Sequence, residues 1–239
     1  MTALLRYQTA ILLRSHRWIF PLIAYGLLMA VGAAGSTSLA ETLDWSGAML
    51  VPVVAFLTRG MLTAEPDAAR ACVFAAAGPA RAQVATLIVP LGAGALLGIA
   101  AAVFDVLTAE AATKVPGSGL PGKVTAAAGH PGIVLAGLLI ALVCVLVGSA
   151  VGALCNPPLL RHPAAAMLST LAAIIFALAA GVSPANAAIA HTTAQAASPL
   201  AANWPGTGAL LGAACLAAVA WGVSVTAATH RDTWSAGSS

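Results

Sequence analysis

The hydrophobic residues of this chain are concentrated in long runs, and short segments that contain most of the charged residues separate the runs. Six runs stand out, near residues 18–35, 45–62, 81–104, 131–155, 163–182 and 206–228. An α-helix of about 20 residues crosses the roughly 30 Å of hydrocarbon in a bilayer. The pattern therefore predicts an all-α, polytopic membrane protein, in which residues 1–239 form one transmembrane domain with six spanning helices.

The charged residues between the runs predict the orientation of the helices. All eight arginines lie in segments that six crossings place on one side, at Arg6, Arg14, Arg17, Arg59, Arg70, Arg81, Arg161 and Arg231. The only two lysines, Lys114 and Lys123, share one segment on the other side. Because basic residues in short loops stay cytoplasmic, we expect both termini, including the 229–239 tail, to be cytoplasmic. Arg59 lies near the inner end of the second span, where its side chain can reach the interface and anchor the helix.

The composition excludes a soluble protein. Hydrophobic residues make up 60% of the 239 residues and charged residues 7%, whereas soluble domains carry roughly 25% charged residues. The formal net charge of +3 indicates orientation and contact with anionic lipid headgroups, not a nucleic-acid surface. The four cysteines show neither a disulfide framework nor metal-ligand spacing. The excess of arginine over lysine and the abundant alanine indicate a GC-rich bacterium, so we expect a bacterial plasma membrane protein.

Residues 1–17 have the pattern of an amphipathic helix. One face of a helical wheel carries apolar side chains, those of Leu4, Tyr7, Ile11 and Trp18. The opposite face carries the three arginines of this segment, so we expect an interfacial helix that rests on the inner leaflet. The alternative is a charged segment that simply precedes the first span.

The first hydrophobic run has a competing interpretation as a signal peptide. It follows a basic segment, and Ser38-Leu39-Ala40 resembles a cleavage site with small residues. However, the run is longer than the hydrophobic region of a typical signal peptide, and Trp18, Phe20 and Tyr25 lie at its inner end. We therefore expect a retained transmembrane helix.

Three pairs of glycines at a spacing of four residues predict close helix packing: Gly94 and Gly98, Gly148 and Gly152, and Gly208 and Gly212. Two segments on the outer side are long. Residues 105–130 are rich in glycine and proline and indicate a loop. Residues 183–205 are mildly apolar and contain three prolines, so they fit either a re-entrant hairpin or a surface loop with a short helix.

The cytoplasmic segment 63–80 predicts a short helix between the second and third spans. Pro66 suits a first helical turn, and Glu65 and Asp67 place negative charge near the positive end of the helix dipole. Gly78-Pro79 is a strong signal for the end of the helix. A helix fixed between two spans can transmit a movement from a soluble partner, although a solvated connector has the same local pattern.

With this segment the chain resembles the ABC-2 type permeases, the membrane subunits of ATP-binding-cassette exporters. The resemblance consists of the layout of the spans, the stretch Glu65-Pro66-Asp67-Ala68-Ala69-Arg70 and the stretch Gly78-Pro79-Ala80-Arg81. It implies that 63–80 is a coupling helix and that Arg81 anchors the third span. By matching position, the residues that it implies for contact with the ATPase are Glu65, Asp67, Arg70 and Phe74. The alanines before Gly78 depart from the family, in which bulkier apolar residues are common there.

The resemblance also implies the partners. Two copies of a separate ATPase subunit would bind ATP and Mg, and a second permease, identical or related, would complete the pathway. The segment Gly117–Lys123 resembles a phosphate-binding loop, but Val124 occupies the position of the magnesium-binding Ser or Thr, and no strand precedes it. We therefore expect no cofactor in this chain itself.

The sequence contains no constellation that predicts a catalytic or metal site. The five histidines are scattered, and no carboxylate pair lies within one span. Asp105 is a candidate for the translocation pathway, although its position favours an interfacial charge at the outer end of a helix. We expect an exporter of hydrophobic or amphipathic cargo such as drugs, peptides or lipids. The alternatives are a self-sufficient channel or proton-coupled carrier and, less favoured, an intramembrane enzyme.

Overall fold

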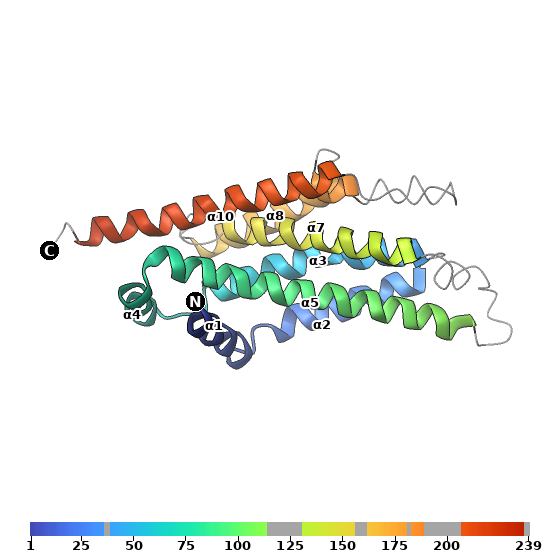
Figure 1. Cartoon of the computed structure of the whole chain (residues 1–239), viewed down its shortest axis with the longest axis horizontal. Helices are drawn as coiled ribbons and strands as arrows, with labels where there is room; N and C mark the ends of the chain where they lie inside the picture. The colour runs from blue at the N-terminus through green and yellow to red at the C-terminus, as the bar shows by residue number, and fades with distance from the viewer. Residues whose placement is uncertain (36–38, 114–130, 156–161, 181–182, 189–206, 237–239) are drawn as a thin grey trace.

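The computed structural model describes the chain except for residues 36–38, 114–130, 156–161, 181–182, 189–206 and 237–239. The described part is helical and contains no strand, which confirms the all-α prediction. Its helices are α1 (Thr2–Arg14), α2 (Ile19–Gly35), α3 (Leu39–Leu62), α4 (Asp67–Ala77), α5 (Pro79–Thr113), α7 (Pro131–Leu154), α8 (Pro163–Ala179) and α10 (Thr207–Ala236). Figure 1 shows that the long helices lie side by side in an elongated bundle.

Five helical segments of the described chain are long and apolar enough to cross a bilayer, which identifies a membrane protein. They are Glu41–Leu62, Pro79–Thr108, Val134–Leu154, Ala164–Ala188 and Gly208–Thr229. Helix α2 is also apolar, but its 17 residues are only about 25 Å long, slightly less than the hydrocarbon thickness. The sixth crossing therefore remains a prediction.

Helix α3 occupies the centre of the bundle. It packs against α2, α5, α7 and α8, and its largest contact is with α7. Leu50, Val51 and Val54 of α3 are completely buried in the main hydrophobic core. Each of the two helices that flank α4 contains an internal proline, Pro52 in α3 and Pro90 in α5.

Glycines allow the backbones of α3 and α7 to approach closely. A methyl group on Gly148 would lie 2.7 Å from the carbonyl oxygen of Val51, and one on Gly152 would lie 2.8 Å from that of Ala55. Gly94 of α5 similarly faces Val54 of α3, at 2.5 Å. The predicted close packing is therefore confirmed at these two glycine pairs. It is not found at the third pair, because a methyl group would have open space at Gly208 and ordinary contact at Gly212.

Two hydrogen bonds connect α2 to α3. The Tyr25 hydroxyl donates to the carbonyl oxygen of Ser46 at 3.1 Å, and the Trp45 indole N–H donates to that of Leu28 at 2.9 Å. Tyr25 and Met29 are buried in the core. Helix α2 is therefore an integral part of the bundle, as expected of a retained helix.

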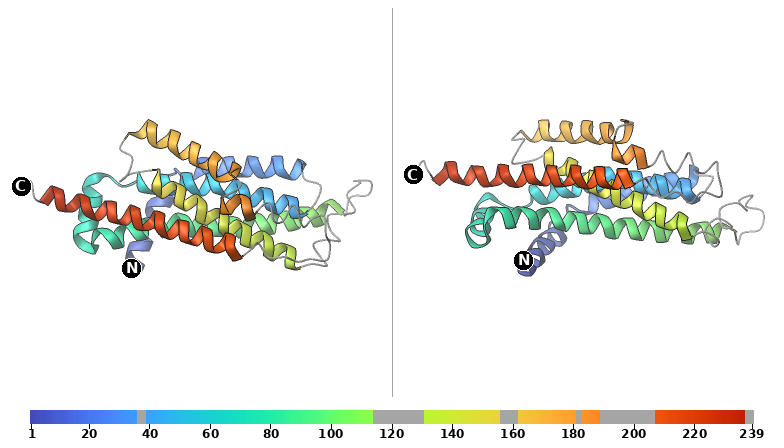
Figure 2. Two further views of the ribbon diagram at one scale, coloured as in Figure 1. Left: turned by 90° about the horizontal axis from the view of Figure 1, so that it is seen from above. Right: turned by 45° about the horizontal axis from the view of Figure 1, so that its top comes forward.

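Helix α1, helix α4 and the C-terminal end of α10 lie at the same end of the bundle (Figures 1 and 2). The end of α5 and the start of α7 lie at the opposite end. Helix α1 runs across the bundle axis instead of along it (Figure 2). The described ends of the chain therefore lie on the side of α4, and their orientation relative to the membrane stays a prediction.

Several boundaries differ from the prediction. Helix α5 continues to Thr113, nine residues into the segment 105–130 predicted as a loop, and α4 is limited to Asp67–Ala77 within the predicted 63–80. Helix α10 continues to Ala236, into the segment predicted as a tail, because no glycine or proline interrupts the chain between Gly222 and Gly237. Within the predicted outer segment 183–205, residues 184–188 are helical, and the Asn186 side-chain amide donates to the carbonyl oxygen of Leu178 near the end of α8 at 2.7 Å. The possible re-entrant hairpin otherwise lies outside the described residues.

We predict that Gly148→Ala and Gly152→Ala destabilise the protein, because each new methyl group would overlap the backbone of α3. The expected loss is roughly 1–3 kcal/mol in the free energy of unfolding, measured by thermal unfolding in detergent. Gly222→Ala is the matched control, because nothing lies within 4 Å of a methyl group there. Equal stability of all three variants would contradict the packing.

Candidate functional site

Helix α4 is bounded by a proline and a glycine, but Pro66, predicted in the first helical turn, lies just before the helix. Pro66 precedes the helix in an extended conformation, with φ −60° and ψ 147°. Gly78 follows it at φ 82°, a conformation that L side chains rarely adopt, and its N–H donates to the carbonyl oxygen of Phe74 at 2.9 Å. Helix α5 then begins at Pro79, so a single residue separates the two helices. The predicted stop at Gly78-Pro79 is confirmed.

One face of α4 is exposed and consists of small side chains. We call this the alanine face, and it is formed by Ala68, Ala71, Cys72 and Ala75. These residues lie at spacings of three and four, which place them on one side of a helix. Val73 and Phe74 are half-buried, and α4 packs against α5. The exposed surface of α4 is therefore narrow, and its short side chains leave the backbone accessible to a partner.

Two arginines bind the carbonyl groups at the C-terminal end of α3. Arg17 donates from Nη1 to the carbonyl oxygen of Thr63 at 3.0 Å and to its hydroxyl at 3.2 Å. Arg70 of α4 donates from Nη2 to the carbonyl oxygen of Leu62. The last carbonyls of a helix have no partner within the helix and carry partial negative charge. The two guanidinium groups satisfy them and tie α3 to α4 and to the segment after α1.

Glu65, between α3 and α4, is held by α1. The Gln8 side-chain amide donates to Glu65 Oε1 at 3.1 Å, and Gln8 is only 1% exposed. Burial raises the pKa of the Tyr7 hydroxyl, and the negative charge of Glu65 and a hydrogen bond to it raise that pKa further. We call Gln8, Tyr7, Glu65, Arg17 and Arg70 the junction brace. It joins α1, α3 and α4 through polar contacts.

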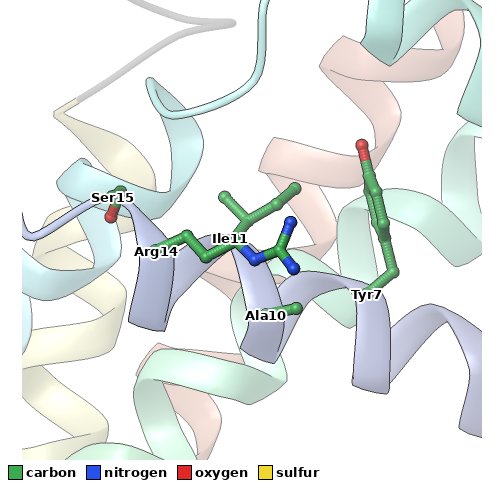
Figure 3. A pocket seen from close by; sticks show the side chains of 5 residues that line it. All are labelled: Tyr7, Ala10, Ile11, Arg14 and Ser15. Carbon is green, nitrogen blue, oxygen red and sulfur yellow. The ribbon is translucent and has the colours of Figure 1, made fainter.

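An open pocket of about 310 Å³ lies along α1. It is lined by Tyr7, Ala10, Ile11, Arg14 and Ser15. Figure 3 shows the guanidinium group of Arg14 extending over Ala10, between Ile11 and Tyr7. The pocket thus combines one cationic group with an apolar wall, and it lies at the end of the bundle that carries α4.

The structure brings some of the predicted site residues together. Glu65 and Arg70 both belong to the junction brace, where Gln8 donates to Glu65 and Arg70 donates to the carbonyl oxygen of Leu62. Asp67 is the first residue of α4, and Phe74 is half-buried on its inner side. The predicted anchors lie where expected along the chain, because Arg59 is in the last turn of α3 and Arg81 near the start of α5. Arg59 is half-buried and Arg81 is exposed.

The sequence reasoning missed three members of the brace, Tyr7, Gln8 and Arg17, as partners of the α3–α4 segment. The sequence did contain a signal that Gln8 has a buried partner. On the helical wheel it falls between Leu4 and Leu12, so it is a polar residue within the apolar face of α1. A polar residue in that position needs a buried hydrogen-bond partner.

Asp105 lies elsewhere, in α5 toward the end opposite to α4. It is 1% exposed, and α5 continues past it to Thr113. It is therefore a buried carboxyl group, three residues before the end of the Pro79–Thr108 segment, and both interpretations of it stay predictions. Within the described residues, no three His, Cys, Asp or Glu side chains gather into a group that could hold a metal ion.

Comparisons with protein-family models, with curated proteins and with solved structures find no match to this chain. The junction brace, the alanine face, the bundle and the sequence pattern around α4 are therefore the features from which a function can be inferred.

We predict that Tyr7 ionises above the ordinary value of 10.0. The folded protein holds this proton more tightly than the unfolded chain, so the contribution to stability is complete below pH 10 and is lost as the pH rises through the higher value. The chain has only two tyrosines, so Tyr25→Phe leaves Tyr7 as the single source of tyrosinate absorbance. Adding Glu65→Gln should lower the pH midpoint of the Tyr7 titration, because it removes the negative charge beside the hydroxyl. An unchanged midpoint would contradict the contact.

Proposed function

We propose that this chain is the transmembrane permease subunit of an ABC exporter. The observation that carries the proposal is α4: a short helix fixed between two spanning helices, braced by α1, with an exposed face. It lies at the end of the bundle where both termini lie. Arg17 and Arg70 bind carbonyl groups at the end of α3, and the buried Gln8 donates to Glu65 just before α4. A solvated connector does not need these contacts.

The alanine face is the surface that we propose for contact with the ATPase. Its side chains are short, so α4 can enter a groove of the partner without a large cost in side-chain entropy. Glu65 and Arg70 then act mainly by holding α4, while Asp67 and Phe74 flank the contact. Two ATPase subunits would bind ATP and Mg beneath two permeases, and the permease itself carries out no bond chemistry.

The contacts around α4 offer a route for mechanical transmission. A force on α4 reaches α3 through Arg70, and it reaches α5 through the single residue Gly78. Helix α5 in turn is hydrogen-bonded to α10, because the buried Gln83 amide donates to the Ser224 hydroxyl at 2.9 Å. ATP-driven movement of α4 would therefore tilt several spans together, as alternating access requires.

The membrane arrangement that we propose has six crossings, with α2 as the first. Its hydrogen bonds to α3 place it inside the bundle, and a small bilayer deformation accommodates its length. The arginine distribution supports cytoplasmic termini, and the excess of arginine over lysine with abundant alanine supports a bacterial plasma membrane. The core between the helices is almost uncharged, which favours a hydrophobic or amphipathic cargo such as a drug, peptide or lipid. A second permease would face it across the pathway.

The pocket on α1 fits a lipid of the inner leaflet. The guanidinium group of Arg14 would bind the phosphate of an anionic headgroup, and Ile11 and Ala10 would contact its acyl region. This contact would hold α1 at the interface while it supports Glu65.

The second candidate function is a self-sufficient proton-coupled carrier. The observation that favours it is the buried carboxyl group of Asp105. A neighbouring reading frame that encodes an ABC ATPase would favour the exporter, and its absence would favour the carrier.

We predict that a membrane-impermeant maleimide labels Cys72 only from the cytoplasmic side. Cys72 is exposed on α4, whereas Cys215 is exposed within the α10 span and would be shielded by lipid. Inside-out vesicles should react and intact cells should not, with Cys72→Ser as the control. Labelling in intact cells would refute the orientation and with it the exporter.

We predict that Ala71→Trp abolishes assembly with the ATPase encoded in a neighbouring reading frame. An indole on the alanine face would prevent close approach, so co-purified ATPase should fall about tenfold or more. Ala71→Ser is the matched control, because it adds a polar atom but little volume. Ala71 is exposed, so neither change should disturb the bundle. Unchanged co-purification and ATP hydrolysis with Ala71→Trp would refute the proposed contact.

A further inference from the structure

The interior of the bundle contains a carboxyl group that makes no full hydrogen bond among the described residues and has only the Ser46 hydroxyl beside it. Asp105 is 1% exposed, and neither of its carboxylate oxygens has a hydrogen-bond partner within the part of the chain that the structure describes. An ionised carboxylate in such surroundings needs water, several donors or a cation, because the loss of hydration is otherwise uncompensated.

The groups around Asp105 come from three other helices. Tyr25 of α2 lies within electrostatic range of Asp105 and of Cys144 of α7, and Asp44 of α3 lies within range of Cys144. Ser46 of α3 lies beside the Asp105 carboxyl. These titratable neighbours are neutral or acidic at neutral pH. None of them supplies a positive charge.

The donors nearest to Asp105 are committed to other acceptors. The Tyr25 hydroxyl donates to the carbonyl oxygen of Ser46 at 3.1 Å, and the Ser46 hydroxyl donates to that of Leu43 at 3.0 Å. The described arginines do not reach the site. On α5 itself, Arg81 is 24 residues away, which is about 36 Å along a helix.

We propose that Asp105 is a proton-binding site. A proton is the one cation that needs no cavity, which suits a carboxyl group that is 1% exposed. The carboxylate takes a proton from hydronium and leaves water, and the new O–H has the Ser46 hydroxyl oxygen beside it as an acceptor. When the helices around Asp105 separate and water enters, the carboxyl releases the proton. The site thus couples the packing of α2, α3, α5 and α7 to protonation.

This inference does not rest on the proposed function. A proton-binding carboxyl can serve an ATP-driven permease or a carrier, and its test requires no ATPase. The two proposals therefore fail separately.

Infrared spectroscopy of the full chain in phosphatidylcholine vesicles tests the proposal. A neutral carboxyl group has a C=O stretch that is well separated from the bands of a carboxylate and that shifts on transfer to D₂O. We expect this band between pH 6 and 7 in the native protein and its complete loss in Asp105→Asn. If Asp105→Asn does not fold, Asp105→Glu can assign the band to residue 105. This variant keeps a carboxyl group there but shifts the frequency of its C=O stretch.

Two control variants locate the proton. Glu65→Gln alters a carboxyl group outside the bundle interior and should leave the band unchanged. Asp44→Asn should also leave the band unchanged. Loss of the band in Asp44→Asn together with its retention in Asp105→Asn would show that Asp44 binds the proton, and it would overturn the assignment to Asp105. Absence of the band in the native protein between pH 6 and 7 would show an ionised carboxylate and would overturn the proposal altogether.

Discussion

The close backbone contact between α3 and α7 is the constraint on which the rest of the bundle depends. In a bilayer the lipid tails are as apolar as the helices, so apolar side chains alone do not hold two helices together. Gly148 and Gly152 remove the side chains that would separate α7 from Val51 and Ala55. This contact fixes α3 at the centre. From there α3 positions α2 at one end of the bundle and the α4 segment at the other.

The coarse fold could be predicted because hydrophobic run length and charge position act locally. Each span is recognised from its own residues, and Gly78-Pro79 marks the end of α4 without reference to any other helix. The third glycine pair shows the limit of such reasoning. Gly208 and Gly212 have the same spacing as the other pairs but do not meet a neighbouring backbone, because spacing does not reveal which face of a helix will be covered.

The candidate site was only partly predictable for the same reason. Gln8 and Glu65 are separated by 57 positions, and Arg17 and Thr63 by 46, so no local pattern connects them. The sequence pointed to Glu65 and Arg70 as contacts for another protein, whereas the fold has them bind the chain's own groups. Asp105 was recognised as unusual, but its burial depends on how far α5 extends and on which helices surround it.

The internal prolines of α3 and α5 have a mechanical consequence. Pro52 lies ten residues before the end of α3 at Leu62, and Pro90 lies eleven residues after α5 begins at Pro79. Each therefore lies about 15 Å from the α4 end. Proline removes one hydrogen bond from the helix ladder and makes bending easier at that level. The two weak points thus define a common hinge plane. The halves of α3 and α5 next to α4 can swing as one unit about this plane, relative to the distal halves around Asp105.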